Sequence, residues 1–226
     1  MNILVTGANR GLGLALVKEG VKRGHRVIAA SRSTSLDLEQ LKEKHSDQII
    51  TLKMDVGGEE SVGQAKETLK SEDLVLHAII NNAGVLYSRD KEVTELDLEE
   101  GLKTFEINTF GPIRVVKHFL PLMSDAPILM NISSDAGSIT NTYGSDYFYG
   151  MSKAALNMFS EKLRLAYKHA AVYSVHPGWM HTDMGGEKAP LDPEQVATDL
   201  VDMIEGKKQV ASEHSYMDYT GKQLKF

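Results

Sequence analysis

Cysteine is absent from the 226 residues of the chain. Its absence excludes a disulfide framework, catalysis by a thiolate and metal sites with cysteine ligands, and it agrees with a reducing compartment. The composition is otherwise that of an ordinary globular protein, with 42% hydrophobic and 25% charged residues. A chain of this length buries roughly 70% of its unfolded surface on folding. We therefore expect residues 1–226 to form a single domain that needs no disulfide or metal for stability.

The sequence also lacks an excess of positive charge and a long hydrophobic run. Its formal net charge of -6 argues against a surface that binds nucleic acid or anionic membranes. The apolar segment 1–5 has no basic residues before it and ends close to Gly7, so it is too short for a signal peptide or a membrane span. We expect a cytoplasmic protein that acts on a small molecule and holds any anionic ligand at a local positive site.

Short apolar segments alternate with amphipathic ones along most of the chain. Strands are predicted at residues 3–6, 26–30, 49–54, 74–80, 128–132 and 171–175. Helices are predicted at residues 11–23, 36–44, 59–69, 98–122, 150–167 and 193–204. Strands that are apolar on both faces and alternate with helices indicate a parallel sheet covered on both sides. The pattern therefore predicts one α/β domain.

A glycine-rich segment, residues 6–13, joins the first predicted strand to the first helix with the spacing G-x-x-x-G-x-G. Its glycines permit a tight turn and close approach of the backbone to a ligand. The helix N-terminus then offers free N–H groups to a pyrophosphate. The segment predicts a dinucleotide site, and a purely structural turn is the alternative. The predicted contacts from this loop are Gly7, Asn9, Arg10, Gly11, Leu12 and Gly13.

Two arginines bear on which dinucleotide binds. The second predicted strand runs into Arg32 and lacks the carboxylate that usually binds the ribose 2′-hydroxyl of NAD. Arg32 is instead placed to pair with a 2′-phosphate, and Arg10 is placed to reach the same phosphate from the glycine loop. Guanidinium groups suit such charge-assisted pairing. We predict NADP(H) as the cofactor, the alternative being two solvated surface arginines.

Asp55 and Val56 follow the third predicted strand, at the edge of the sheet where the glycine loop lies. The carboxylate of Asp55 is expected to accept a hydrogen bond from the adenine amino group. Its alternative role is to cap the helix that begins near residue 59. The sequence does not separate these two roles.

Tyr149 and Lys153 are four residues apart, so they share a face of a helix. A cation about 4 Å from a phenol, at an effective dielectric near 20, is worth roughly 4 kcal/mol, or about 3 pKa units. This predicts a tyrosine pKa of about 7, which suits giving and taking a proton. The same spacing occurs at Tyr87 and Lys91, but in a charged segment that we interpret as a solvated loop or helix start.

The fifth predicted strand ends at two serines, Ser133 and Ser134. A serine at the carboxyl end of a strand lies on the ligand side of an open α/β sheet, where it can hydrogen-bond a substrate carbonyl. A metal site is conceivable at one group of residues, namely His176, His181 and Asp183. We interpret them as a turn and a helix start and expect no metal, since no further ligand is evident.

These motifs, taken in order, resemble the classical short-chain dehydrogenase/reductase family over nearly the whole chain. The matching segments are the cofactor loop 6–13, the fourth-strand motif 81–84, Asn108, Ser134, the pair Tyr149 and Lys153, and the turn 177–178. The resemblance implies a doubly wound Rossmann-type domain with a parallel seven-stranded sheet in the order 3-2-1-4-5-6-7. The seventh strand is expected near residues 215–219.

The resemblance also implies roles for these residues. Tyr149 is the acid/base that protonates the carbonyl oxygen as hydride arrives, and Lys153 lowers its pKa and holds the nicotinamide ribose. Ser134 polarises the carbonyl and is preferred to Ser133 because Ser-Asp-Ala-Gly matches the family's Ser-x-x-Gly register. Asn108 holds a water in the proton path. Further implied cofactor contacts are Asn82, Ala83, Gly84, Met180 and Thr182, while Asn81 braces the sheet.

Within the family, residues 177–186 resemble a branch of carbonyl reductases that includes the sniffer and C-factor proteins. Only residues 184–192 separate Thr182 from the next predicted helix, a short lid that implies an open site and broad or bulky substrates. The implied function is an NADP(H)-dependent carbonyl reductase acting on a carbonyl or alcohol. An NADP(H)-binding signalling protein is the alternative, and an epimerase or dehydratase is disfavoured because few residues follow the sixth strand. Relatives suggest a homodimer or homotetramer formed through helices near 98–122 and 150–167.

Overall fold

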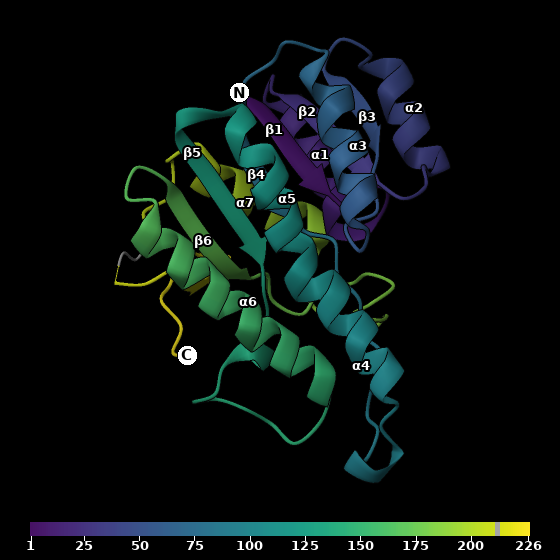
Figure 1. Ribbon diagram of the computed structural model, residues 1–226, viewed down its shortest axis with the longest axis vertical. Helices are drawn as coiled ribbons and strands as arrows, with labels where there is room; N and C mark the ends of the chain where they lie inside the picture. Colours follow the sequence, from purple (N-terminus) through teal and green to yellow (C-terminus); the bar gives the residue numbers. More distant parts are fainter. Residues whose placement is uncertain (211–212) are drawn as a thin grey trace.

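The computed structural model describes residues 1–210 and 213–226, and in this part of the chain seven parallel strands form one sheet (Figure 1). The strand order β3-β2-β1-β4-β5-β6-β7 confirms the order implied by the family resemblance, and with it the single Rossmann-type domain. The strands are β1 (Asn2–Thr6), β2 (Arg26–Ser31), β3 (Ile49–Lys53), β4 (Leu76–Asn81), β5 (Met123–Ile132), β6 (Ala171–His176) and β7 (Tyr216–Asp218).

Helices cover both faces of the sheet (Figure 1). Residues of α1 (Gly11–Lys22), α2 (Leu36–Lys44) and α7 (Pro193–Ile204) belong to the hydrophobic cluster on one face. Residues of α3 (Glu59–Lys70), α5 (Gly111–Phe119) and α6 (Tyr147–Ala166) belong to the cluster on the other. Strand β1 shows the underlying pattern, because Ile3 and Val5 face the first cluster and Leu4 the second.

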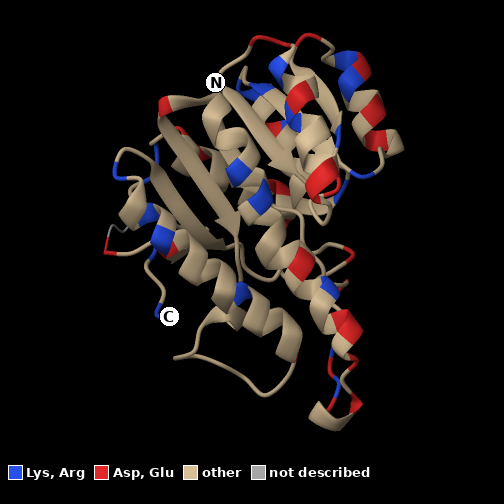
Figure 2. Cartoon of the chain, viewed as in Figure 1, with Lys and Arg blue, Asp and Glu red and all other residues tan. Residues whose placement is uncertain are grey.

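Most charged side chains lie on helices and loops (Figure 2), and strands β1 and β6 carry no Lys, Arg, Asp or Glu. Two helix starts follow their sequence signals. The Ser35 side chain accepts from the Leu38 N–H at the start of α2, and Asp192 caps α7, where Pro193 occupies the first turn. No helix among the described residues is long and apolar enough to cross a membrane.

The helix predicted at residues 98–122 is wrong as one continuous helix. It divides into α4 (Leu98–Phe105), a π-helical segment (Glu106–Phe110), α5, and a 3₁₀ turn (Leu120–Leu122). Pro112 has no N–H to donate, so the regular ladder of hydrogen bonds cannot pass through this region unchanged. A π-helical turn often marks a functional site, and this one carries Asn108. Helix α6 also begins earlier than predicted, at Tyr147, which places Tyr149 in its first turn.

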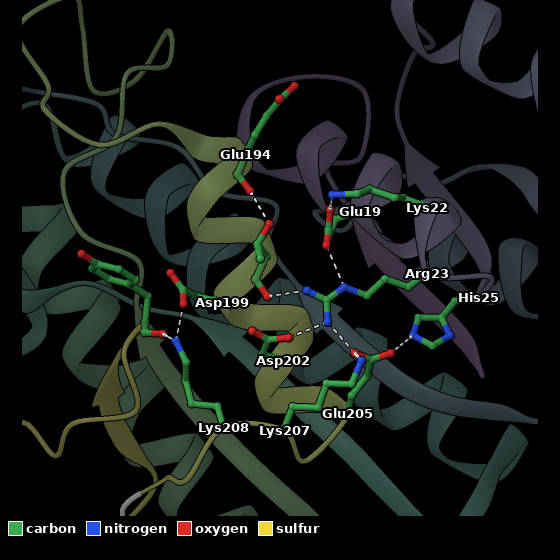
Figure 3. A network of polar contacts seen from close by, with 12 residues as sticks. Glu19, Lys22, Arg23, His25, Glu194, Asp199, Asp202, Glu205, Lys207 and Lys208 are labelled. Atoms are coloured by element: carbon green, nitrogen blue, oxygen red, sulfur yellow. Dashed lines mark hydrogen bonds and ion pairs between the residues drawn. The ribbon is translucent and has the colours of Figure 1, made fainter.

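A network of charged side chains joins α1 to α7 (Figure 3). Arg23, whose side chain is 15% exposed, donates to Glu19 at 2.7 Å and to Asp202 and Glu205 at 2.5 Å each. Burial raises the pKa of the Glu205 carboxyl, but hydrogen bonds from Lys207 and Arg23 outweigh it and lower that pKa to about 2. The network fixes α7 against the helix that carries the glycine loop.

Candidate active site

A cleft of about 940 Å³ lies at the carboxyl ends of the strands. Its lining includes the residues that follow β1, β3, β4 and β6, at Gly7, Asp55, Asn82 and Pro177. This is the edge at which open α/β sheets bind ligands. The predicted site residues that line the cleft are Gly7, Asn9, Arg10, Gly11, Leu12, Gly13, Arg32, Asp55, Val56, Asn82, Ala83, Gly84, Ser134, Tyr149, Lys153, Met180 and Thr182.

The glycine loop is shaped for close approach. Gly7 has φ +64°, and a Cβ added to Gly13 would lie 2.1 Å from the Gly7 carbonyl oxygen. The side chain of Asn82 braces the loop by donating to the carbonyls of Thr6 and Gly7 at 2.9 and 3.2 Å. Helix α1 has no hydrogen bond from a capping side chain at Arg10, so its first N–H groups are left for a ligand in the cleft. The glycine loop therefore fits a dinucleotide pyrophosphate.

The two predicted phosphate-binding arginines differ in their surroundings. Arg32 is exposed just after β2. Arg10 donates to Asp183 at 2.5 Å, and both of these side chains are largely exposed. The guanidinium of Arg10 therefore spans from the glycine loop to the segment that follows β6.

Asp55 does not cap α3. The N-cap residue of that helix is Gly58, and the Asp55 side chain accepts from the Gly57 N–H at 2.9 Å within its own turn. The alternative role in helix capping is therefore wrong. The carboxylate lines the cleft beside Val56, and its contact with adenine stays a prediction.

Tyr149 and Lys153 lie together near the start of α6, with the lysine Nζ 5.5 Å from the centroid of the tyrosine ring. Lys153 is 4% exposed, and its Nζ donates to the Ile132 carbonyl at 2.6 Å. Burial lowers the pKa of Lys153 to about 8. Burial raises the pKa of Tyr149 to about 12, and the hydroxyl of Ser134 opposes this rise.

The tyrosine pKa predicted from the Tyr149–Lys153 spacing is therefore wrong in this structure. The ammonium of Lys153 is directed at a backbone carbonyl, and the loss of solvent around Tyr149 dominates its titration. The phenol is consequently protonated at neutral pH, so it can act as a proton donor. The second copy of the spacing, Tyr87 and Lys91, lies in irregular chain outside the helices.

The two serines after β5 have different surroundings. Ser133 is buried, and its hydroxyl donates to the Asn157 side chain at 2.6 Å. Ser134 lies beside Tyr149, as its effect on the tyrosine pKa indicates, and both residues line the cleft. The geometry favours Ser134 as the group that meets a substrate carbonyl.

Asn108 is the one predicted site residue that does not line the cleft. Its side chain is buried and exchanges hydrogen bonds with the backbone of Val85, accepting at 2.8 Å and donating at 2.9 Å. A Cβ added to Gly84 would lie 3.4 Å from Asn108 Oδ1 and 3.7 Å from Lys153 Nζ, so both side chains approach the same side of this glycine. The water-holding role of Asn108 stays a prediction.

Several cleft residues were missed from the sequence, among them Arg89, Asp146 and His176. Arg89 and Asp146 lie in irregular segments that periodicity does not place. His176 directly precedes the Pro-Gly turn, and that position was the available signal. Among the described residues, no group of His, Asp and Glu side chains is arranged to hold a metal ion.

The fold and this cleft define a Rossmann-type oxidoreductase. The chain belongs to the short-chain dehydrogenase family, whose model ("short chain dehydrogenase") matches residues 1–192. It is similar to 1-hydroxy-2-glutathionyl-2-methyl-3-butene dehydrogenase of Rhodococcus sp., with 32% identity over 90% of each chain. It is 35% identical to the C-signal protein of Myxococcus xanthus over 65% of this chain and 90% of that one.

Two solved structures are also similar over their full length. The carbonyl reductase Sniffer of D. melanogaster has a TM-score of 0.90 and 32% identity, covering 100% of this chain and 99% of that chain. The NADPH-bound carbonyl reductase from chicken fatty liver has a TM-score of 0.88 and 26% identity, covering 100% and 98%. These similarities confirm the resemblance to the sniffer and C-factor branch.

Proposed function

We propose that this protein is an NADP(H)-dependent carbonyl reductase that transfers hydride between the nicotinamide and a carbonyl or alcohol substrate. The observation that carries the proposal is a single cleft with a glycine loop and two arginines together with Ser134, Tyr149 and Lys153. The similarity to Sniffer and to an NADPH-bound carbonyl reductase supports the same activity. A cytoplasmic location is part of this proposal, since the cysteine-free sequence agrees with a reducing compartment.

The bound nicotinamide supplies or accepts the hydride, and the side chains handle the proton. In reduction, Tyr149 donates its phenolic proton to the carbonyl oxygen, which becomes the alcohol hydroxyl. The raised pKa of Tyr149 keeps that proton available at neutral pH. Ser134 donates a hydrogen bond to the same oxygen. Lys153, whose pKa is about 8, carries the positive charge at neutral pH that stabilises the tyrosinate.

The same residues carry out the reverse proton transfer when an alcohol is oxidised. The tyrosinate then takes the hydroxyl proton while the hydride leaves the carbon. Asn108 is proposed to hold a water that relays protons toward Lys153, because its Oδ1 and the Lys153 Nζ both lie next to the position of a Cβ added to Gly84. The raised pKa of Tyr149 keeps the phenol protonated at neutral pH, the form that reduction requires at its start.

A substrate panel tests the activity directly. The protein is mixed with aldehydes, ketones and quinones, with NADPH and NADH in separate reactions, and the nicotinamide absorbance is followed. We expect turnover of several bulky carbonyls with NADPH, because the segment between Thr182 and α7 is short. One substrate reduced far better than all others would contradict broad specificity, and no turnover at all would contradict the proposed function.

Two arginines are proposed to select the 2′-phosphate. In this proposal Arg10 exchanges Asp183 for the phosphate, and Arg32 pairs with it from the end of β2. The double variant Arg10→Ala with Arg32→Ala should raise KM for NADPH by about a hundredfold and leave KM for NADH nearly unchanged. Lys18→Ala, which removes a surface cation from α1, is the matched control. Equal losses with both cofactors would contradict the assignment.

A signalling role is a second candidate because of the similarity to the C-signal protein. The two functions separate in the Tyr149→Phe variant. A biological phenotype that survives while reduction is lost would favour signalling through the bound nucleotide. A phenotype that disappears together with turnover would favour catalysis.

A homodimer or homotetramer is also part of the proposal. Leu98 and Leu102 on α4 and Met151, Met158 and Leu165 on α6 are all more than half exposed. Helices α4 and α6 contact one another, so these side chains lie on neighbouring helices. Large exposed apolar side chains of this kind mark association surfaces.

A further inference from the structure

The peptide group between Ser134 and Asp135 is hydrogen-bonded to a side chain at each of its two polar atoms. Its carbonyl oxygen accepts from the phenol of Tyr216 at 2.8 Å. Its N–H donates to His176 Nδ1 at 3.0 Å. The sheet itself makes its last backbone bond to this segment one residue earlier, from the Ser133 N–H to the Val175 carbonyl at 2.7 Å.

Each of the two side chains comes from a neighbouring strand. His176 is the last residue of β6, and Tyr216 is the first residue of β7. Ser174 pairs with Tyr216 in the register of these two strands, so the strand pairing fixes the separation of the two side chains. The carbonyl and N–H of a trans peptide point in opposite directions. The peptide is therefore held from both sides.

Tyr216 is suited to be a permanent donor. It is fully buried, and its ring stacks on Phe226 with centroids 5.5 Å apart. Burial raises the pKa of Tyr216 well above its usual range. The phenol therefore keeps its proton at neutral pH and donates a hydrogen bond to the Ser134 carbonyl.

His176 is suited to be the acceptor. Burial lowers the pKa of its imidazole, while the nearby carboxylates Asp135 and Asp218 oppose this shift. The imidazole is therefore neutral at neutral pH. Because Nδ1 accepts the Asp135 N–H, the ring proton must sit on Nε2. Protonation of Nδ1 in acid would replace this acceptor with a donor and break the bond.

The held peptide directly follows the residue that meets the substrate. Ser134 has an extended backbone, with φ -159° and ψ 155°, and this ψ sets the plane of the peptide that the two side chains grip. The Ser134 hydroxyl also accepts from the Ala136 N–H at 3.2 Å, so its position depends on the same turn. Misplacement of a catalytic group by about 1 Å can lower a rate by about a hundredfold.

We propose that His176 and Tyr216 are positioning residues that clamp the Ser134–Asp135 peptide and thereby hold the Ser134 hydroxyl toward Tyr149 and the substrate carbonyl. The inference rests on the proposed reductase function. The two residues do not touch the reacting atoms in this account, and they act only through Ser134. Loss of either one frees the peptide, so the second loss adds little.

The variants His176→Leu and Tyr216→Phe test the clamp. Each should lower kcat about 10- to 100-fold and leave KM for NADPH unchanged. His176→Asn should restore most of the activity, because its Oδ1 is bonded to Cγ as Nδ1 is in histidine and can accept the same N–H. The control His77→Leu removes another imidazole Nδ1 that accepts a backbone N–H at 3.0 Å, from Asn2. Tyr173→Phe is the control for loss of a partly buried phenol on β6.

The Ser134→Ala background distinguishes a loss of Ser134 positioning from a nonspecific loss of structure. In that background His176→Leu and Tyr216→Phe should have no further effect on kcat, because the hydroxyl that they position is gone. The inference would be overturned if His176→Leu and Tyr216→Phe lowered kcat as much in the Ser134→Ala background as in the wild type. It would also be overturned if the controls His77→Leu and Tyr173→Phe lowered kcat as much as the two clamp variants do. The double variant His176→Leu with Tyr216→Phe should be about as active as the slower single variant.

An NMR measurement that needs no turnover tests the positioning role of His176 and Tyr216 separately from the proposed reductase function. The ¹³Cζ resonance of Tyr149 reports its contact with Ser134. It should shift in His176→Leu and Tyr216→Phe in the same direction as in Ser134→Ala, and stay at the wild-type position in His77→Leu. An unshifted resonance in both clamp variants would overturn the inference even if no carbonyl is reduced. Absence of wild-type turnover with the expected shifts would contradict only the reductase proposal.

Discussion

Replacement of Lys153 by methionine should lower kcat/KM for carbonyl reduction by about a hundredfold. The Nζ atom lies 5.5 Å from the centroid of the Tyr149 ring, and the lysine side chain is buried. Two opposite charges about 5.5 Å apart at an effective dielectric near 20 attract by about 3 kcal/mol. The ammonium is therefore expected to stabilise the tyrosinate formed during turnover by about this much, although burial keeps the pKa of the resting phenol high. Methionine keeps the length of the side chain and removes its charge, so the loss measures this electrostatic contribution.

The assay is the pH profile of kcat/KM with NADPH and one good carbonyl substrate. Burial lowers the pKa of Lys153 to about 8, so wild-type activity should fall as the pH rises through about 8 and the ammonium loses its proton. The Lys153→Met variant should be slow at neutral pH and lack this alkaline limb. Lys162→Met, on the exposed side of α6, is the control. A loss smaller than about threefold, or an unchanged alkaline limb, would refute the reasoning.

Arg23→Gln should destabilise the fold by about 3 kcal/mol in denaturant melts, because Asp202 and the largely buried Glu19 and Glu205 lose the guanidinium that they share. The loss should shrink as the pH falls from about 4.5 to about 2, where Glu205 takes up a proton in the folded state; a pH-independent loss would contradict this. Gly13→Ala should abolish NADPH binding in a calorimetric titration, since its Cβ would lie 2.1 Å from a carbonyl oxygen; retained affinity would contradict the glycine-loop assignment. Leu102→Glu with Met158→Glu should give monomers in light scattering, and an unchanged mass would place the interface elsewhere.

The parallel sheet was predictable because most of its strands are apolar on both faces, and its strand order was predictable because the motifs at the strand ends resemble those of the short-chain dehydrogenase/reductase family. Helices α2 and α7 have the predicted bounds, since a serine or aspartate cap marks each start. The division of the helix at residues 98–122 was not predictable from periodicity. It depends on contacts such as the one between Asn108 and Val85, which lie 23 residues apart. Strand β7 has only three residues, and its partner β6 defines it more than its own sequence does.

The candidate site also has features that the local sequence predicts and features that depend on distant parts of the chain. The glycine loop and the Tyr149–Lys153 pair are local patterns, and the structure brings both to one cleft. The direction of the Lys153 ammonium depends on a carbonyl 21 residues away, at Ile132. The pKa of Tyr149 depends on burial by the whole fold, which spacing does not report. The contact between Tyr216 and Ser134 spans 82 residues, so no local pattern could have suggested it.

The central claim is that Tyr149 supplies the proton for carbonyl reduction with NADPH. The most direct test measures kcat and the NADPH Kd for the wild type and Tyr149→Phe, with Tyr87→Phe as the control. We predict that Tyr149→Phe binds NADPH as tightly as the wild type and loses at least about a hundredfold in kcat, while Tyr87→Phe retains both. Retention of wild-type kcat by Tyr149→Phe would contradict the account.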